Sequence, residues 1–122
     1  MAKKILVIED ENDLVKAILI RLQQAGYEVS MAKDGQEGLE KARREEPDLI
    51  LLDLMLPKMD GYKICGLLKA DARYKSIPII MATARAQETD EVLGLEVGAD
   101  AYFTKPFEYG KLLAKIKELL KE

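Results

Sequence analysis

The chain has 122 residues and a formal net charge of −3, from 19 basic and 22 acidic side chains, so it lacks the basic surplus that general nucleic-acid binding requires. Histidine is absent, which excludes histidine-based catalysis and argues against a zinc site. The single cysteine, Cys65, cannot form an internal disulfide and is interpreted as a small buried hydrophobe. No long apolar run or signal-peptide pattern occurs, so we expect one cytoplasmic domain, residues 1–122, without membrane contact.

Strand-like and helix-like segments alternate along the chain. In chain order, the predicted elements are a strand at 4–9, a helix at 12–25, a strand at 27–31, a helix from 34 to the residue before 47, a strand at 49–53, a helix after 61 to about 71, a strand at 77–82, a helix at 86–97, a strand at 101–104 and a helix at 108–121. Apolar runs and alternation predict the strands, and apolar residues three and four apart predict the helices. Gly26 and Gly98 stand where helix C-terminal caps are expected, and Asp34 with Glu37 fits a capping box.

Five strands alternating with five helices predict an α/β fold with a doubly wound parallel sheet and helices on both of its faces. The second strand alternates Tyr27, Val29 and Met31 with polar residues, which predicts that one of its faces is wetter. In parallel sheets of this kind, ligands bind just beyond the carboxyl ends of the strands. The residues at those ends are therefore the candidate site.

Charged and hydroxyl side chains follow four of the predicted strands. Glu9 and Asp10 end the first, Asp53 ends the third, Thr83 follows the fourth and Lys105 follows the fifth. If the first and third strands are neighbours, their carboxylates crowd one another and favour a cation. Oxygen ligands without histidine or cysteine suit Mg²⁺, and one carboxylate remains free as a nucleophile toward a phosphoryl group. The metal, Lys105 and Thr83 would stabilise the charge of that group.

These strand-end residues, in this order, resemble the response-regulator receiver domains of two-component signalling. Residues 53–61 (DLMLPKMDG) and 98–107 (GADAYFTKPF) are especially similar, and the resemblance covers essentially the whole chain. It implies a flavodoxin-like (βα)5 fold with strand order 2-1-3-4-5. It also implies a phosphorylation-activated switch that takes its phosphoryl group from a sensor histidine kinase or a histidine phosphotransfer protein. Such a protein is not a classical enzyme, because it catalyses only its own phosphorylation and dephosphorylation.

The resemblance implies a Mg²⁺ site. Asp10 and Asp53 would ligate the ion directly, Glu9 would do so through water, and Met55 would contribute its backbone carbonyl. Glu9 stands where aspartate is more familiar, and its extra methylene should alter the placement of water around the metal more than it should abolish binding. Met55 and Arg85 occupy positions that tune the lifetime of the phosphorylated state in the family.

The resemblance also implies the phosphoacceptor and the switch. Asp53 would accept the phosphoryl group, while Lys105 and Thr83 would contact its oxygens. Tyr102 matches the aromatic that turns inward when Thr83 moves, and phosphorylation would bias a pre-existing equilibrium between two states. The Lys105–Pro106 bond matches the position of a cis peptide bond.

The output face of the family comprises the fourth helix, the fifth strand and the last helix, where receivers joined to winged-helix DNA-binding domains often dimerise through charged pairs. This chain keeps two residues of that pattern, Glu96 and Asp100. It departs from the pattern at four positions, which are Glu91, Ala101, Lys111 and Lys115. Lysine lacks the bidentate fork of arginine, which weakens the case for a phosphorylation-dependent dimer. We expect a stand-alone receiver with a downstream protein target, rather than a fragment that lacks its effector domain.

Two other functions remain open from the residues alone. A Mg²⁺-dependent phosphohydrolase of the haloacid-dehalogenase type also uses an aspartate nucleophile, but it carries a second aspartate two residues later, where this chain has Met55. A flavodoxin-like cofactor binder needs a phosphate loop after the first strand, where Glu9, Asp10 and Glu11 would repel a phosphate. The receiver interpretation explains more of the strand-end residues than either alternative.

Overall fold

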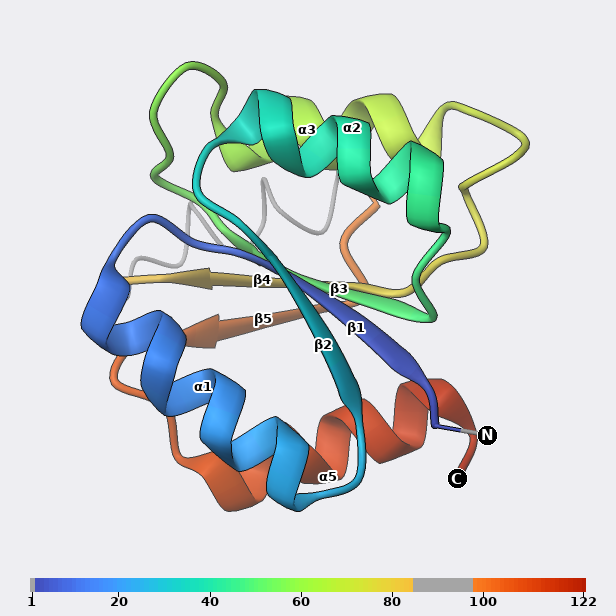
Figure 1. Cartoon of the computed structure of the whole chain (residues 1–122). Coiled ribbons are helices and arrows are strands. Elements are labelled where there is room, and N and C mark those ends of the chain that lie inside the picture. Colours follow the sequence, from blue (N-terminus) through green and yellow to red (C-terminus); the bar gives the residue numbers. More distant parts are fainter. Residues whose placement is uncertain (1, 85–97) are drawn as a thin grey trace.

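A five-stranded parallel sheet forms the centre of the computed structural model, which describes residues 2–84 and 98–122 (Figure 1). The strands are β1 (Lys4–Ile8), β2 (Glu28–Ala32), β3 (Leu49–Asp53), β4 (Ile79–Thr83) and β5 (Ala101–Thr104). They lie in the order β2-β1-β3-β4-β5, and every neighbouring pair is parallel. The predicted doubly wound sheet with order 2-1-3-4-5 is confirmed.

Helices cover both faces of the sheet. On one face lie α1 (Asn12–Gln24) and α5 (Tyr109–Leu120), and on the other lie α2 (Gly35–Glu45) and α3 (Gly61–Lys69) (Figure 1). The helix predicted at 86–97 lies outside the described residues. Because both faces are covered, the inner strands β1, β3 and β4 are continuous apolar runs except at one end of each, rather than alternating.

The side chains of a single strand divide between two cores. Ile5 and Val7 of β1 belong to the core under α1 and α5, whereas Leu6 and Ile8 belong to the core under α2 and α3. All four are buried. Cys65 lies in the second core, as predicted, and burial raises the pKa of its thiol to about 11, so it remains an unreactive thiol at neutral pH.

Several predicted boundaries differ from the structure. The fourth strand runs over Ile79–Thr83 rather than 77–82, because Pro78 has no N–H to donate and offers only its carbonyl, which accepts from Ile50. β1 ends one residue earlier than predicted and α3 ends at Lys69, where Ala70 begins a series of turns. The prediction of one wetter face for β2 was wrong, because Met31 is 37% exposed on this edge strand.

Predicted end signals of two helices are confirmed. Gly26 follows α1 with φ +94°, a conformation that glycine adopts without strain. Asp34 caps α2, and its side chain accepts a hydrogen bond of 2.8 Å from the backbone N–H of Glu37.

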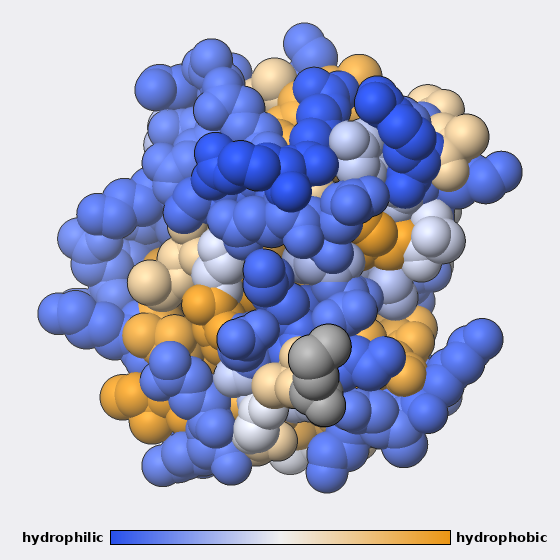
Figure 2. Space-filling view, turned by 45° about the vertical axis from the view of Figure 1, so that its right-hand side comes forward, coloured by the Kyte–Doolittle hydropathy of each residue, from blue (hydrophilic) through white to orange (hydrophobic). Residues whose placement is uncertain are grey.

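The ends of the chain lie near each other, at the amino-terminal edge of the sheet (Figure 1). Tyr27, before β2, donates a hydrogen bond of 2.7 Å to the side chain of Glu122, after α5. Hydrophilic side chains cover most of this face of the molecule (Figure 2). Among the described residues, no helix combines the length and apolarity needed to cross a bilayer.

Candidate functional site

The sheet register brings the predicted residues to one edge. Ile8 of β1 pairs with Leu52 of β3, so Glu9 and Asp53, the residues that follow, stand side by side. Asp53 in turn pairs with Ala82 of β4, and Thr83 pairs with Thr104 of β5. The carboxyl ends of four strands therefore meet at the edge opposite the chain termini (Figure 1).

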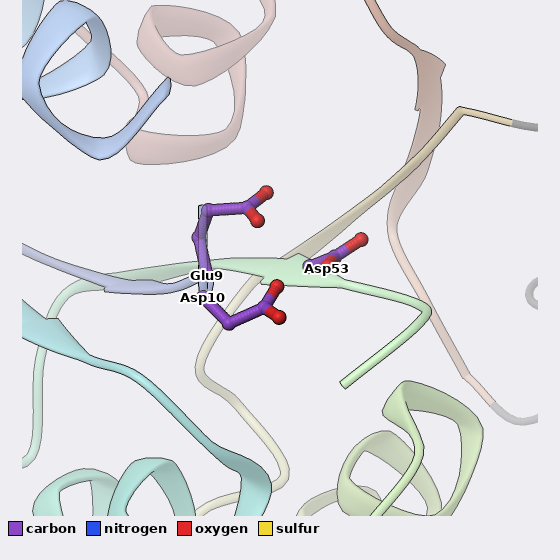
Figure 3. A group of neighbouring side chains, drawn as sticks. All are labelled: Glu9, Asp10 and Asp53. Atoms are coloured by element: carbon purple, nitrogen blue, oxygen red, sulfur yellow. The ribbon is translucent and has the colours of Figure 1, made fainter. Parts of the chain in front are cut away.

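Three carboxylates gather at this edge. One oxygen from each of Glu9, Asp10 and Asp53 lies within 4.8 Å of the others, and the three side chains extend into the same space beyond the strand ends (Figure 3). Glu9 is 3% exposed and Asp53 is 5% exposed, whereas Asp10 is open to solvent. Two of the three carboxylates are thus buried, and the third lies beside them at the protein surface.

The ammonium group of Lys105 lies between the two buried carboxylates. Its Nζ is 3.1 Å from Asp53 Oδ1 and 2.5 Å from Glu9 Oε1. The backbone positions it, since its N–H donates to the carbonyl of Thr83 and its bond to Pro106 is cis, as predicted. Among the described residues, this site contains three carboxylates for one ammonium, so its charge favours the arrival of a further cation.

Burial and charge shift the ionisation of these groups. Burial raises the pKa of Asp53, and the nearby Lys105 ammonium opposes this without cancelling it. Burial likewise raises the pKa of Glu9, against the hydrogen bond from Lys105. Burial by itself would lower the pKa of Lys105, but the hydrogen bond to Glu9 and the charge of Asp53 raise it on balance, so the ammonium stays protonated at neutral pH.

The segment after Asp53 folds back closely on the strand. Leu54 donates to the carbonyl of Ala82, and Gly61 donates to the carbonyl of Leu54 at 3.0 Å. A Cβ on Gly61 would lie 2.7 Å from the backbone oxygen of Asp53, so only glycine allows this approach. The sequence places Gly61 directly after Asp60, before the predicted helix, but its position there does not indicate this close approach.

Residues 5–117 match the sequence model of the response regulator receiver domain. This chain belongs to that family. The transcriptional regulatory protein PhoP for alkaline phosphatase synthesis in Bacillus subtilis is 48% identical over 121 residues, which are 99% of this chain and 50% of PhoP. The chain spans about half the length of the curated relatives it matches.

Solved receiver domains share the whole fold. The CheY-like receiver domain protein of Methanospirillum hungatei has a TM-score of 0.90 at 36% identity, covering 99% of this chain and 95% of that one. The BeF3-activated receiver domain of DrrB has a TM-score of 0.89 at 33% identity, with full coverage of both chains. Receiver domains are regulators of two-component systems and not classical enzymes.

Receiver domains bind Mg²⁺ at an acidic pocket, and the donor set here fits that ion. Glu9, Asp10 and Asp53 offer only hard oxygen ligands, which Mg²⁺ prefers to nitrogen and sulfur. Asp53 also accepts a long hydrogen bond of 3.4 Å from the backbone N–H of Met55, so the Met55 backbone lies at the same site. The Met55 side chain is exposed to solvent.

The two predicted switch residues of this receiver domain occupy neighbouring strands. Thr83 is fully buried at the end of β4. Tyr102 of β5 pairs with Met81, two residues before Thr83, so the pleat places all three side chains on the same face of the sheet. Tyr102 is partly buried and packs against the core under α2 and α3. Arg85 lies outside the described residues.

Charged residues at the positions where related receivers form dimer pairs make contacts within this chain instead, as far as they are described. Asp100 Oδ2 accepts hydrogen bonds from Lys69 Nζ at 2.9 Å and from the backbone of Ile79 at 2.8 Å. Lys111 pairs with Glu108 and Lys115 pairs with Glu118, in each case along α5, while Ala101 is buried. Glu91 and Glu96 lie outside the described residues.

Proposed function

We propose that this chain is a phosphorylation-activated switch in which Asp53 accepts a phosphoryl group from a phosphohistidine of a sensor histidine kinase or phosphotransfer protein. The observation that carries the proposal is the position of Asp53. Its carboxylate is buried and lies 3.1 Å from the ammonium group of Lys105. One of its oxygens also lies within 4.8 Å of an oxygen from each of two further carboxylates. That environment can hold a cation beside a nucleophilic oxygen at the strand edge where parallel sheets bind their ligands.

In the proposed transfer, an Asp53 carboxylate oxygen attacks the phosphorus, and a P–O bond forms as the P–N bond to histidine breaks. The electron pair of the broken bond leaves with the imidazole nitrogen. In the proposed transfer, the Lys105 ammonium group gives up part of its contact with Asp53 and Glu9. It then contacts an oxygen of the transferred phosphoryl group. Thr83 would donate its hydroxyl hydrogen to another oxygen, so the negative charge of the group is stabilised from two sides.

The proposed ligands of Mg²⁺ are the carboxylates of Asp10 and Asp53, Glu9 through water, and the backbone carbonyl of Met55. When bound, the ion would neutralise negative charge on the phosphoryl oxygens. The chain's own contribution is to hold Asp53 and Glu9 in a buried position with raised pKa values, so that a cation and not bulk water compensates them.

The proposed output is a shift of an existing equilibrium. When the Thr83 hydroxyl moves toward the phosphoryl group on Asp53, it leaves space on the face of the sheet that Thr83 shares with Tyr102. The aromatic ring of Tyr102 then moves inward. The surface around β5 and α5 would then present a different shape to a downstream protein or effector domain. PhoP is a transcriptional regulator by name, and an effector for this chain remains part of the proposal.

The test is phosphorylation by a small donor. Intact mass spectrometry of the protein with Mg²⁺ and acetyl phosphate should show the gain of one phosphoryl group, which EDTA prevents. Asp53→Asn should abolish the gain. Asp13→Asn, an exposed aspartate in the first turn of α1, is the matched control and should be labelled like the wild type.

Two results would contradict the proposal. One is undiminished labelling of Asp53→Asn, which would place the phosphoryl group elsewhere. The other is continuous release of phosphate from many small phosphoesters, which would favour the aspartate-nucleophile phosphohydrolase. Met55 argues against this second outcome, because it stands where that class carries its acid/base aspartate.

A further inference from the structure

The loop after Asp53 touches the start of a helix that is distant from it in sequence. Gly35, the first residue of α2, donates a long hydrogen bond of 3.4 Å to the carbonyl of Pro57. One residue earlier, Asp34 Oδ2 lies 3.4 Å from the ammonium group of Lys58. The loop therefore has two polar contacts with the amino-terminal end of α2.

The contact at Gly35 leaves no room for a side chain. A Cβ at this position would lie 2.5 Å from the backbone oxygen of Met59 and 2.7 Å from its Cβ. It would also lie 2.9 Å from the side chain of Ile64. The nearest atom belongs to the backbone of the loop, so a substitution at Gly35 has to displace either the loop or the start of α2.

The middle of this loop depends on such support. Its two ends are held by the hydrogen bonds of Leu54 and Gly61 at the sheet edge. Between them, Lys58 adopts φ +69°, a left-handed conformation that a residue with a side chain adopts only when its surroundings favour it. Within the loop, Met59 donates to the carbonyl of Pro57 at 2.8 Å, and this same carbonyl receives the N–H of Gly35.

We propose that Gly35 is a positioning residue for the metal site, acting through the loop that it contacts. The inference rests on the proposed function, in which the backbone carbonyl of Met55 and the carboxylate of Asp53 bind the same ion. Met55 lies between the strand end and the part of the loop that contacts Gly35. A displaced loop therefore moves one proposed ligand relative to the other, and Mg²⁺ demands near-ideal octahedral geometry.

The test is the Mg²⁺ affinity of Gly35→Ala, measured by titration of amide signals in NMR spectra of the full chain. Gly66→Ala is the matched control, because Gly66 also lies in a helix but has nothing within 4 Å of an added Cβ. We expect the dissociation constant of Gly35→Ala to rise by about tenfold or more, as for other residues that orient metal ligands. That of Gly66→Ala should stay within about twofold of the wild-type value.

Different outcomes separate this inference from the proposed function. If the wild type does not bind Mg²⁺ at the carboxylates, the proposed function fails first. If the wild type binds and a folded Gly35→Ala binds equally well, the positioning role is wrong, even if the variant unfolds at a lower temperature. A purely structural role would lower stability without changing the affinity of the folded protein.

A second measurement on the wild type decides the matter if Gly35→Ala does not fold. Coupling is reciprocal, so Mg²⁺ that depends on the loop must also stabilise the contact between the loop and α2. Saturating Mg²⁺ should slow hydrogen exchange of the Gly35 amide several-fold more than that of the Gly26 amide, which lies at the opposite end of the sheet. Equal exchange of Gly35 with and without Mg²⁺ would overturn the inference.

Discussion

At the residue scale, the site depends on one ammonium group that neutralises two buried carboxylates incompletely. Lys105 contacts both Asp53 and Glu9, yet the pKa values of both carboxyl groups remain raised because burial outweighs the ion pairs. Within the described part of the chain, the site thus holds negative charge that Lys105 does not fully compensate. Uncompensated buried charge lowers the stability of the folded protein, and a cation that binds to the carboxylates raises it again.

Asp53→Asn should therefore stabilise the metal-free protein at neutral pH. A raised pKa means that the folded state binds the Asp53 proton more tightly than the unfolded state. The associated stability is complete below the ordinary carboxyl pKa of about 4 and is lost as pH rises through the raised value. Asparagine removes this loss, so we expect about 1 kcal/mol more unfolding free energy near pH 7 and no gain below about pH 4.

Urea denaturation in EDTA at several pH values measures this difference. Asp13→Asn is the control, since Asp13 lies in the first turn of α1 and interacts favourably with the helix dipole. This control should leave stability unchanged or lower it slightly. An Asp53→Asn protein that is less stable than the wild type near pH 7 would show that the ion pair with Lys105 outweighs the cost of burial.

At the scale of the elements, α2 can approach β1 only because Gly38 has no side chain. A Cβ there would lie 2.6 Å to 3.0 Å from three side-chain carbons of Ile8. Overpacking of this kind costs about 1–3 kcal/mol, which exceeds the gain of about 0.5–1 kcal/mol from replacing glycine by alanine in a helix. Gly38→Ala should lower the unfolding temperature, whereas Gly110→Ala, with open space around it in α5, should raise it.

Thermal unfolding followed by circular dichroism compares the two variants directly. The substitution is the same in both, so the difference isolates the packing of α2 against the sheet. A Gly38→Ala protein as stable as Gly110→Ala would mean that Ile8 changes rotamer at little cost.

Lys69 connects three elements at the amino-terminal ends of β4 and β5. Its ammonium group donates to the carbonyls of Lys75 and Ile77 and to Asp100, which in turn accepts from the backbone of Ile79. Lys69→Met keeps the aliphatic length but leaves these acceptors without their charged donor. We expect the unfolding free energy in urea denaturation to fall by about 1.5–3 kcal/mol, the range for hydrogen bonds to charged groups.

Asp100→Asn distinguishes the hydrogen bonds at this position from the charge. Asparagine retains an oxygen that can accept from Ile79 or Lys69, so the loss should be about 1 kcal/mol. An equal loss in Asp100→Asn and Lys69→Met would indicate that the ion pair itself dominates. In either case Asp100 stabilises the domain, which leaves its carboxylate less available for a charged pair with a second copy.

The elements show what sequence patterns can and cannot predict. Apolar runs place β1 and β3 well because both faces of the sheet are covered, and the parallel arrangement then fixes which residues meet at the edge. The start of the fourth strand was predicted two residues too early, because apolar character continues through Ile77 and Pro78 and only the missing N–H of proline ends the ladder. Local patterns also carry no information on contacts between distant loops, such as Gly35 with Pro57.

The same limit applies within the site. The resemblance implies that Lys105 contacts a phosphoryl group, but it did not indicate that the Lys105 ammonium group pairs with Glu9. That pairing depends on the length of the glutamate side chain and on the path of the backbone after β5. Neither follows from residue type and spacing, because both depend on how the loops pack at the sheet edge.

At the scale of the whole molecule, binding at the strand ends should stabilise the entire fold, because Glu9 and Asp10 directly follow β1 and Asp53 ends β3, and these are two neighbouring inner strands of the sheet. A ligand that binds only the folded state adds RT ln(1 + [L]/Kd), which is about 1.4 kcal/mol at ten times Kd. For a domain of this size we expect Mg²⁺ to raise the unfolding temperature by roughly 5 °C near pH 7. Asp10→Asn should reduce the increase.

The increase in unfolding temperature that Mg²⁺ causes should become smaller as the solution becomes acidic. Protons compete with Mg²⁺ for Asp53 and Glu9, whose pKa values are raised, so affinity falls as pH decreases through those values toward about 4. Differential scanning calorimetry near pH 7 and near pH 5, with NaCl of equal ionic strength as the control, measures both effects. The control matters because the chain carries a net charge of −3, which any salt screens. An equal increase with NaCl would mean that general screening, and not a site at the carboxylates, accounts for the stabilisation.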